Sequence, residues 1–286
     1  MIYFISAFLI VENFILLFAF RGKLVKIFQK IRAKKCCYKF EDKNASYYST
    51  VPMLILHGAG GLNSKKYNNS KEGIIRGISE GYRIIEVDIG ITSDGILVLT
   101  HRFQPDEERI FDVKPTFDEF IINGVPKGET GISLSDFFNM FSRQGTFFLL
   151  DCEHGTENLV IKWIKENKTR EDCKNIIFQV HTLKMLKKVY KESIFDNIHY
   201  NGSSLDIAAN LNMLRKCNVH TCSIADEEIS ENNIYLRKII NSGLHVMVYT
   251  INHMRRFNRV LELGVSGCFS DFLVPNQIEE SKKVSI

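Results

Sequence analysis

Two carboxylates and a histidine are the first residues of this sequence whose types and spacing suggest chemistry. Glu86 and Asp88 end one apolar run, and His101 ends the next, in the stretch EVDIGITSDGILVLTH. Because side chains alternate along a strand, the two acids share one face and lie about 7 Å apart. Acids so placed are costly as strand residues and suited to binding a cation.

A second pair of acids with the same spacing follows another apolar run. Asp151 and Glu153 end the stretch TFFLLDCE. Three or four converging carboxylates repel each other, and one hard divalent cation, Mg²⁺ or Ca²⁺, relieves that repulsion. Zinc is not indicated, because His57 and His101 are isolated in the sequence and no cysteine has ligand spacing.

Two histidines at the ends of apolar runs, His57 and His101, suit general acid–base chemistry, because an imidazole titrates near neutral pH. One can deprotonate a nucleophile while the other protonates a leaving oxygen. A divalent metal beside them would neutralise charge on a phosphoryl group. The six other histidines, which include His154 and His181, are interpreted as having no role in the chemistry.

Further polar residues follow the apolar runs and are candidate substrate ligands. Gln179 and Thr250 end two later runs. Gly58 opens the stretch HGAGG after the first run, where backbone N–H groups can approach an anion. This stretch is neither a Walker loop nor G-x-G-x-x-G, so nucleotide binding is not indicated. Asn69 has two interpretations, a substrate ligand or the N-cap of the helix that follows it.

Short apolar runs alternate with amphipathic stretches from residue 51 onward. The runs cover residues 51–57, 83–89, 146–151, 175–180, 197–200, 219–224, 244–250 and 266–271. The helical patterns cover residues 70–80, 133–143, 157–167, 182–192, 204–216, 232–241 and 253–262. Eight strands alternating with helices predict an α/β fold, a (β/α)₈ TIM barrel, over residues 51–286. Because strand C-termini converge at one end of such a barrel, the polar residues that end the runs would form one cluster.

Two connections depart from this alternation. The dipeptide Asp94-Gly95 is typical of a hairpin turn. Residues 91–101 are therefore predicted to rise above the barrel mouth as a hairpin that carries His101 back toward the acids, rather than as a ninth barrel strand. Residues 102–132 are interpreted as a loop or small insertion.

The N-terminal residues predict a membrane anchor. In residues 1–20, seventeen side chains are apolar, and about 20 such residues span a bilayer. Residues 21–50 are a basic collar and polar linker, with eight Lys or Arg and no acid in residues 21–40. A cleaved signal peptide and an interfacial or buried helix are the alternatives to a single-pass transmembrane helix. The basic collar predicts that the barrel lies on the cytoplasmic side.

Charge and cysteine content exclude several classes of function. The net charge of +4 comes from the collar, and the rest of the chain is mildly acidic. Nothing outside the collar therefore indicates a nucleic-acid partner. The seven cysteines are scattered and odd in number, which indicates no disulfide framework and fits a reducing compartment.

The order of the motifs resembles the glycerophosphodiester phosphodiesterase family. The matching segments are His-Gly, Asn-Ser before a helix, GYRIIEVD, TSDG, LVLTH, FLLDCE, HVMVYTIN and GVSGCFSDFLVP, within residues 51–275. The most specific part is E-x-D, then T-x-D-G, then a histidine thirteen residues after the aspartate. The resemblance implies a metal-dependent TIM barrel, related to the barrels of phosphatidylinositol-specific phospholipases C.

The resemblance also implies roles for individual residues. His57 and His101 would be the acid–base pair. The metal ligands would be Glu86, Asp88 and one acid of the third strand, Asp151 or Glu153.

Three positions depart from the family's pattern. The dipeptide His57-Gly58 stands where the family has His-Arg-Gly. Arg102 follows His101, where the family has an aspartate. Glu153 stands where the family keeps a lysine two residues after the third acid. A branch of the family with His-Ala/Gly-x-Gly-Gly is most similar, and its third ligand is often Asp, so we favour Asp151.

These observations predict a membrane-tethered phosphodiesterase that uses one divalent metal. Its substrates would be glycerophosphodiesters or lysophospholipid head groups, which it would hydrolyse to a glycerol phosphate and an alcohol. The missing Arg and Lys suggest one alternative, a catalytically weak barrel that binds phosphate or lipid at the membrane. A separate alternative is a related lipid phosphodiesterase that releases a cyclic phosphate.

Overall fold

The strands form a closed parallel barrel. The computed structural model describes residues 26–30, 52–61, 68–101, 114–142 and 145–278. Its strands are β1 (Met53–Leu56), β2 (Ile84–Ile91), β3 (Leu97–Leu99), β4 (Phe147–Cys152), β5 (Ile176–Val180), β6 (Asn197–Asn201), β7 (Thr221–Ala225), β8 (His245–Tyr249) and β9 (Gly267–Ser270). The sheet order is β1-β9-β8-β7-β6-β5-β4-β2-β3, and β1 also pairs with β2. That pairing closes eight parallel strands into a ring and confirms the predicted (β/α)₈ barrel.

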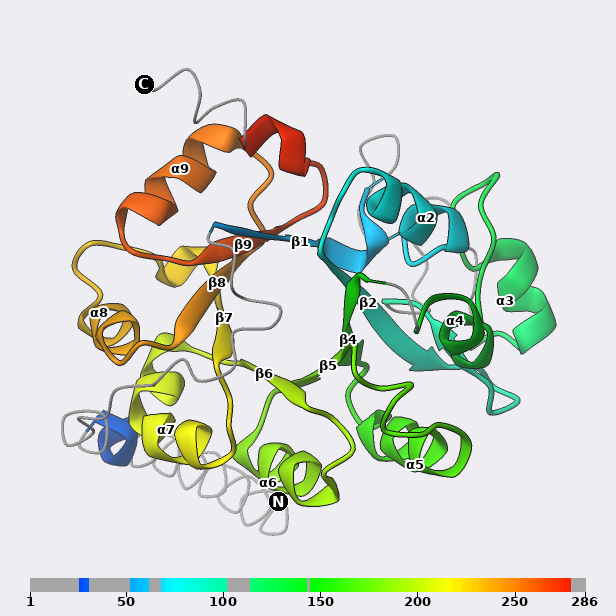
Figure 1. Ribbon diagram of the computed structural model, residues 1–286, viewed down its shortest axis with the longest axis horizontal. Coiled ribbons are helices and arrows are strands. Elements are labelled where there is room, and N and C mark those ends of the chain that lie inside the picture. The colour runs from blue at the N-terminus through cyan, green and yellow to red at the C-terminus, as the bar shows by residue number, and fades with distance from the viewer. Residues whose placement is uncertain (1–25, 31–51, 62–67, 102–113, 143–144, 279–286) are drawn as a thin grey trace, which may run out of the picture.

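Helices surround this ring of strands, as Figure 1 shows in a view along the barrel. They are α2 (Lys71–Ser79), α3 (Phe117–Asn123), α4 (Leu134–Phe141), α5 (Glu157–Asn167), α6 (Leu183–Glu192), α7 (Ser204–Lys216), α8 (Ile234–Asn241) and α9 (Met254–Glu262). Two short 3₁₀ helices, η1 (His57–Ala59) and η2 (Asp226–Glu228), follow β1 and β7. A further helical turn covers residues 26–30 and lies beside α7.

The strand β3 is the returning arm of a hairpin and not a barrel strand. It pairs antiparallel with β2, with Ile89 opposite Leu99 and Ile91 opposite Leu97. Gly95 takes a φ of 85° in the turn, a conformation that glycine adopts without steric cost. The predicted hairpin over residues 91–101 is therefore confirmed.

The interpretation of residues 102–132 as a loop was incomplete, because α3 lies within them. Thr116 caps this helix through a reciprocal capping box with Glu119. The sequence T-x-x-E is a known signature of a helix start, so the signal was present in the sequence.

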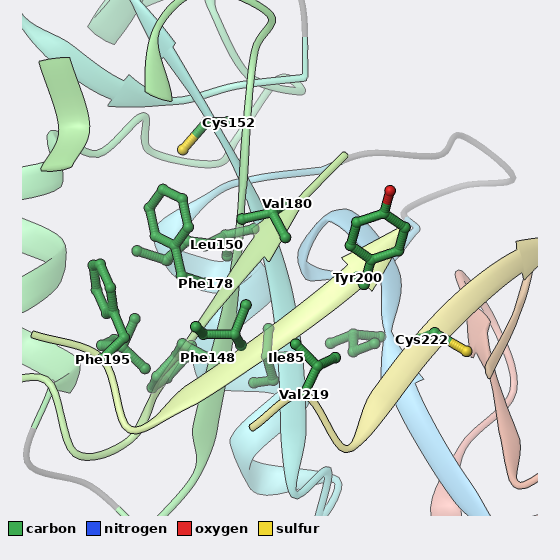
Figure 2. Packing of buried hydrophobic residues seen from close by; sticks show 14 of the residues in the cluster. Ile85, Phe148, Leu150, Cys152, Phe178, Val180, Phe195, Tyr200, Val219 and Cys222 are labelled. Atoms are coloured by element: carbon green, nitrogen blue, oxygen red, sulfur yellow. The ribbon is translucent and has the colours of Figure 1, made fainter. Parts of the chain in front are cut away.

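The core has two parts, because alternate side chains of each strand face opposite sides. Outward side chains pack under the helices, and Figure 2 shows part of this larger cluster. Phe178 and Phe195 stack within it with ring centroids 4.8 Å apart. A smaller cluster fills the inside of the barrel and consists of Met53, Ile55, Ile84, Leu149, Ile177, Met247 and Phe269.

Several predictions fall on the N-terminal region. Within the described residues, no helix has the length and apolar character that crossing a membrane requires. Residues 1–20, in which the transmembrane helix is predicted, lie outside the described part, as does most of the collar and linker over 21–50.

The five cysteines that the structure describes are all buried free thiols.

Candidate active site

The inside of the barrel changes from apolar to polar at the C-terminal ends of its strands. At the ends of five strands, a polar residue lies two positions after an apolar residue of the small cluster inside the barrel. Both side chains of each pair therefore face inward. The pairs are Ile55 and His57, Ile84 and Glu86, Leu149 and Asp151, Ile177 and Gln179, and Phe269 and Asp271. Asp88 follows Glu86 on the same face, and the polar residues therefore converge at the mouth where TIM barrels carry their active sites.

Glu86, Asp88 and Asp151 form a compact acidic cluster. One carboxylate oxygen from each lies within 4.8 Å of the others, and Asp88 is paired directly with Asp151 in the parallel register of β2 and β4. Oxygens that bind one Mg²⁺ or Ca²⁺ at about 2.0–2.6 Å are separated by at most about 5 Å. The donor type and spacing of this cluster therefore fit one hard divalent cation.

Burial and mutual repulsion make these acids hard to ionise without a cation. Glu86 is 2% exposed and Asp88 8% exposed. Burial, then the charges of Asp88 and Asp151, raise the pKa of Glu86 well above its usual value. Burial and then the charge of Asp151 raise the pKa of Asp88 to about 7, although Asn69 and His57 oppose the shift.

These shifts predict that the metal-free protein loses stability as pH rises. Between pH 3.8 and about 7 the Asp88 carboxyl is ionised in the unfolded chain and protonated in the folded one, so folding takes up a proton. The Asp88 contribution to the free energy of unfolding should fall through this window by about 1.4 kcal/mol per pH unit at most. Urea unfolding of chelator-treated wild type and Asp88→Asn at pH 5 and pH 7 measures it.

The wild type should lose more stability than Asp88→Asn over that interval, and a saturating divalent cation should reduce the difference. Equal losses in the two proteins would show that Asp88 is ionised in the metal-free fold.

Asn69 and Gly58 hold the acidic cluster in place. The Asn69 amide donates to Asp88 Oδ2 at 2.8 Å and its oxygen accepts from the Asp88 backbone N–H at 3.0 Å. The Gly58 backbone N–H donates to Glu86 Oε2. The N-cap interpretation of Asn69 was wrong, because Ser70 caps α2 by accepting from the Gly73 N–H. A substrate contact by Gly58 or Asn69 stays a prediction.

Asp271 ends the last apolar run, where the sequence indicated no specific role for it, and its carboxylate orients His57. Asp271 Oδ1 lies 2.9 Å from His57 Nδ1, and Asn252 donates to Asp271 Oδ2 at 2.7 Å. Thr250 Oγ1 lies 3.5 Å from the same His57 nitrogen, so Thr250 is beside the site. The signal for Asp271 was its place two residues after Phe269 at the end of the last apolar run.

A cavity of about 990 Å³ opens beside the acidic cluster. His101 lines it together with Asp88 and Asp151, as predicted from the hairpin. The hairpin is fixed here because the Thr100 N–H donates to the Asp88 carbonyl at 2.9 Å. Gln179 also lines the cavity; it is 4% exposed, and its Oε1 has no hydrogen-bond partner.

Asp151 and Glu153, the two acids at the end of β4, differ in their relation to the acidic cluster. Asp151 joins the cluster, as favoured, and Glu153 does not. Glu153 lines the cavity, and its Oε2 is buried without a hydrogen-bond partner. Arg102, the other departure near the site, lies outside the described residues.

His181 is a second residue of the site that the sequence reasoning passed over. Its Nε2 lies 2.7 Å from Asp151 Oδ1. Burial lowers the pKa of His181, but the hydrogen bond and charge of Asp151, with Glu157, raise it above its usual value overall. His181 therefore lies beside the acidic cluster and contacts one of its carboxylates.

Comparison with known proteins places this geometry in a known fold. No protein-family model and no curated protein matches the sequence. Solved structures match along most of the chain. A glycerophosphodiester phosphodiesterase from Parabacteroides distasonis has a TM-score of 0.63 at 14% identity over 87% of this chain and 90% of its own. The chain has the glycerophosphodiester phosphodiesterase fold.

Two further structures with this fold agree. A glycerophosphodiester phosphodiesterase from Thermotoga maritima has a TM-score of 0.57 at 18% identity, over 77% of this chain and 94% of its own. A phosphodiesterase from Oleispira antarctica, in complex with the product sn-glycerol-3-phosphate, has a TM-score of 0.62 at 17% identity, over 83% of this chain and 99% of its own. The shared fold thus covers nearly the whole of these three solved structures.

Proposed function

We propose that this chain is a metal-dependent phosphodiesterase that hydrolyses glycerophosphodiesters to a glycerol phosphate and an alcohol. The observation that carries the proposal is the cluster of Glu86, Asp88 and Asp151, whose ligand oxygens lie within 4.8 Å of each other at the barrel mouth. The glycerophosphodiester phosphodiesterase fold and the glycerol phosphate product in one structure of that fold support it.

The acidic cluster would hold one Mg²⁺ or Ca²⁺. When bound, the cation would neutralise charge on the phosphate and lower the pKa of a coordinated substrate hydroxyl. Glu86 and Asp88 are held for this role by Gly58 and Asn69. Hydrogen bonds of this kind, made to a metal ligand by a residue that does not itself bind the metal, fix the direction of the ligand's oxygens.

The two histidines would move the protons. His57 contacts Asp271 through Nδ1, so its Nε2 is the atom that would exchange a proton with the substrate. His101 lines the cavity next to Asp88. One histidine would deprotonate the attacking hydroxyl and the other would protonate the leaving alcohol, after which water would open the cyclic phosphate.

Asp271 is a positioning residue in this proposal. Replacing it with alanine removes the contact that orients the His57 ring, so kcat should fall by about 10–100-fold. KM and thermal stability should change little, which distinguishes this role from a general loss of structure. An unchanged kcat with normal thermal stability would contradict the assignment.

A screen of glycerophosphodiesters with each metal tests the proposed reaction. The purified protein should release choline, ethanolamine or inositol and form glycerol phosphate in the presence of Mg²⁺ or Ca²⁺. Binding without turnover would favour the catalytically weak barrel, an alternative that Glu153 in place of lysine motivates. A cyclic phosphate as the final product would favour the other alternative.

We also propose that the barrel is tethered to a membrane by residues 1–20 and acts on lysophospholipid head groups there. The segment after this apolar stretch reaches the catalytic side of the barrel, because Gln29 donates to Asp206 Oδ1 at 3.0 Å in the first turn of α7. Ile27 and Phe28 are exposed there. Protease added outside intact cells should leave residues 41–286 intact, and their digestion would contradict a cytoplasmic barrel.

A further inference from the structure

The cavity beside the acidic cluster has a basic wall that the proposed reaction does not use. Lys184 and Lys188 of α6 both line it. They are four residues apart and therefore lie on the same face of the helix. Lys187 and Lys191 of the same helix do not line the cavity. The basic wall, defined as Lys184, Lys188 and the first turn of α6, is thus one face of an evenly basic helix.

The first turn of α6 adds partial positive charge to this wall. Thr182 caps the helix by accepting from the Met185 N–H, and the first turn contains no acidic residue. Both residues line the cavity. The N-terminus of a helix favours anions because its first N–H groups point outward.

A buried polar group marks the inner end of the same space. Gln179 lines the cavity and is 4% exposed, and its Oε1 has no hydrogen-bond partner. A buried acceptor without a partner is costly unless a donor group of a ligand or a water satisfies it. Gln179 therefore points to a hydroxyl group of a ligand in this cavity.

Acids also line the cavity, but they do not neutralise the basic wall. Glu157 accepts from the Gly155 N–H at 2.9 Å and lies near His154. Glu153 and the clustered Asp88 and Asp151 lie on the strand side. Among the described residues, neither lysine of the wall is in an ion pair. Lys188 instead donates to Asn158 Oδ1 at 2.5 Å, across the gap from α6 to α5.

We propose that the basic wall is a subsite for a second anionic group of the substrate. The substrate class is then a phosphodiester in which one of the two alcohols carries a phosphate, with the diester at the acidic cluster and the second phosphate at α6. This inference rests on the proposed function for the position of the diester. The cavity of about 990 Å³ has room for a ligand of this size, since ligand pockets of about 300–1,000 Å³ take drug-sized molecules.

The ratio of two substrates tests the subsite. Wild type should have a kcat/KM for a ring-phosphorylated glycerophosphoinositol about tenfold above that for glycerophosphoinositol, because phosphate–lysine contacts are charge-assisted. Lys184→Gln/Lys188→Gln should bring the ratio close to one. The matched control Lys187→Gln/Lys191→Gln removes the same charge from the same helix outside the cavity and should keep the wild-type ratio.

The proposed subsite would be contradicted if wild type and Lys184→Gln/Lys188→Gln had the same ratio of kcat/KM values for the two substrates. It would also be contradicted if the control variant lost as much of this ratio as the cavity variant. Calorimetric binding of myo-inositol 1,4-bisphosphate to the metal-loaded full chain gives the same comparison without turnover. If no glycerophosphodiester is hydrolysed, the proposed function fails, and this binding comparison still decides the subsite. Weaker binding in the cavity variant alone supports it, and equal binding in all three proteins contradicts it.

Discussion

Replacing His101 with alanine is expected to lower kcat for a glycerophosphodiester by about 10²–10⁴-fold, the usual contribution of a positioned general acid or base. The imidazole lines the cavity with Asp88 and Asp151, and the hairpin that carries it is fixed to β2 by pairing of β2 with β3. Because the histidine moves a proton and does not hold the phosphate, KM should change little. Steady-state kinetics at saturating metal measures both constants.

His154→Ala is the matched control for this experiment. His154 lines the same cavity, but its side chain is fully exposed. The control variant should retain near wild-type kcat. Turnover by His101→Ala at the wild-type rate, or an equal loss in the two variants, would contradict the role of His101 in proton transfer.

Replacing Glu86 with glutamine is expected to abolish metal binding and lower turnover by about 10³-fold or more, since a metal contributes several kcal/mol of transition-state stabilisation. The change keeps the shape of the side chain and removes one of the three charges that the cation balances. The same change should stabilise the metal-free protein, because burial and the neighbouring acids raise the pKa of Glu86. Thermal unfolding with and without Mg²⁺ or Ca²⁺ measures both effects.

Asp151 in β4 and Glu153 just after it allow a sharper comparison of metal ligands. Asp151→Asn should remove the stabilisation by metal, because Asp151 belongs to the cluster. Glu153→Gln, two residues along the same strand end, should retain it. If Glu153→Gln lost metal stabilisation and Asp151→Asn kept it, the third ligand would be Glu153 and the cluster would be differently composed.

The barrel could be predicted from the sequence because each strand and helix carries its own local pattern. The run predicted over residues 83–89 overlaps β2 (Ile84–Ile91), and the helix predicted over 204–216 matches α7 to the residue. The metal candidates could be predicted for the same reason, since alternation along one strand already places Glu86 and Asp88 on one face.

Contacts between distant strands could not be predicted in this way. His57 and Asp271 are 214 positions apart, and they meet only because β1 pairs with β9 in one particular register. His181 reaches Asp151 from the neighbouring strand end. In both cases the sequence showed a polar residue after an apolar run, while its partner depended on which strands are neighbours.

The most direct test of the proposed function is a phosphorus NMR time course of one glycerophosphodiester with the purified full chain, first treated with a chelator and then given Mg²⁺ or Ca²⁺. The diester signal should stay constant in chelator and convert to a glycerol phosphate signal once metal is added. A diester signal that persists with both metals, or hydrolysis that proceeds equally in chelator, would contradict a metal-dependent phosphodiesterase built on Glu86, Asp88 and Asp151.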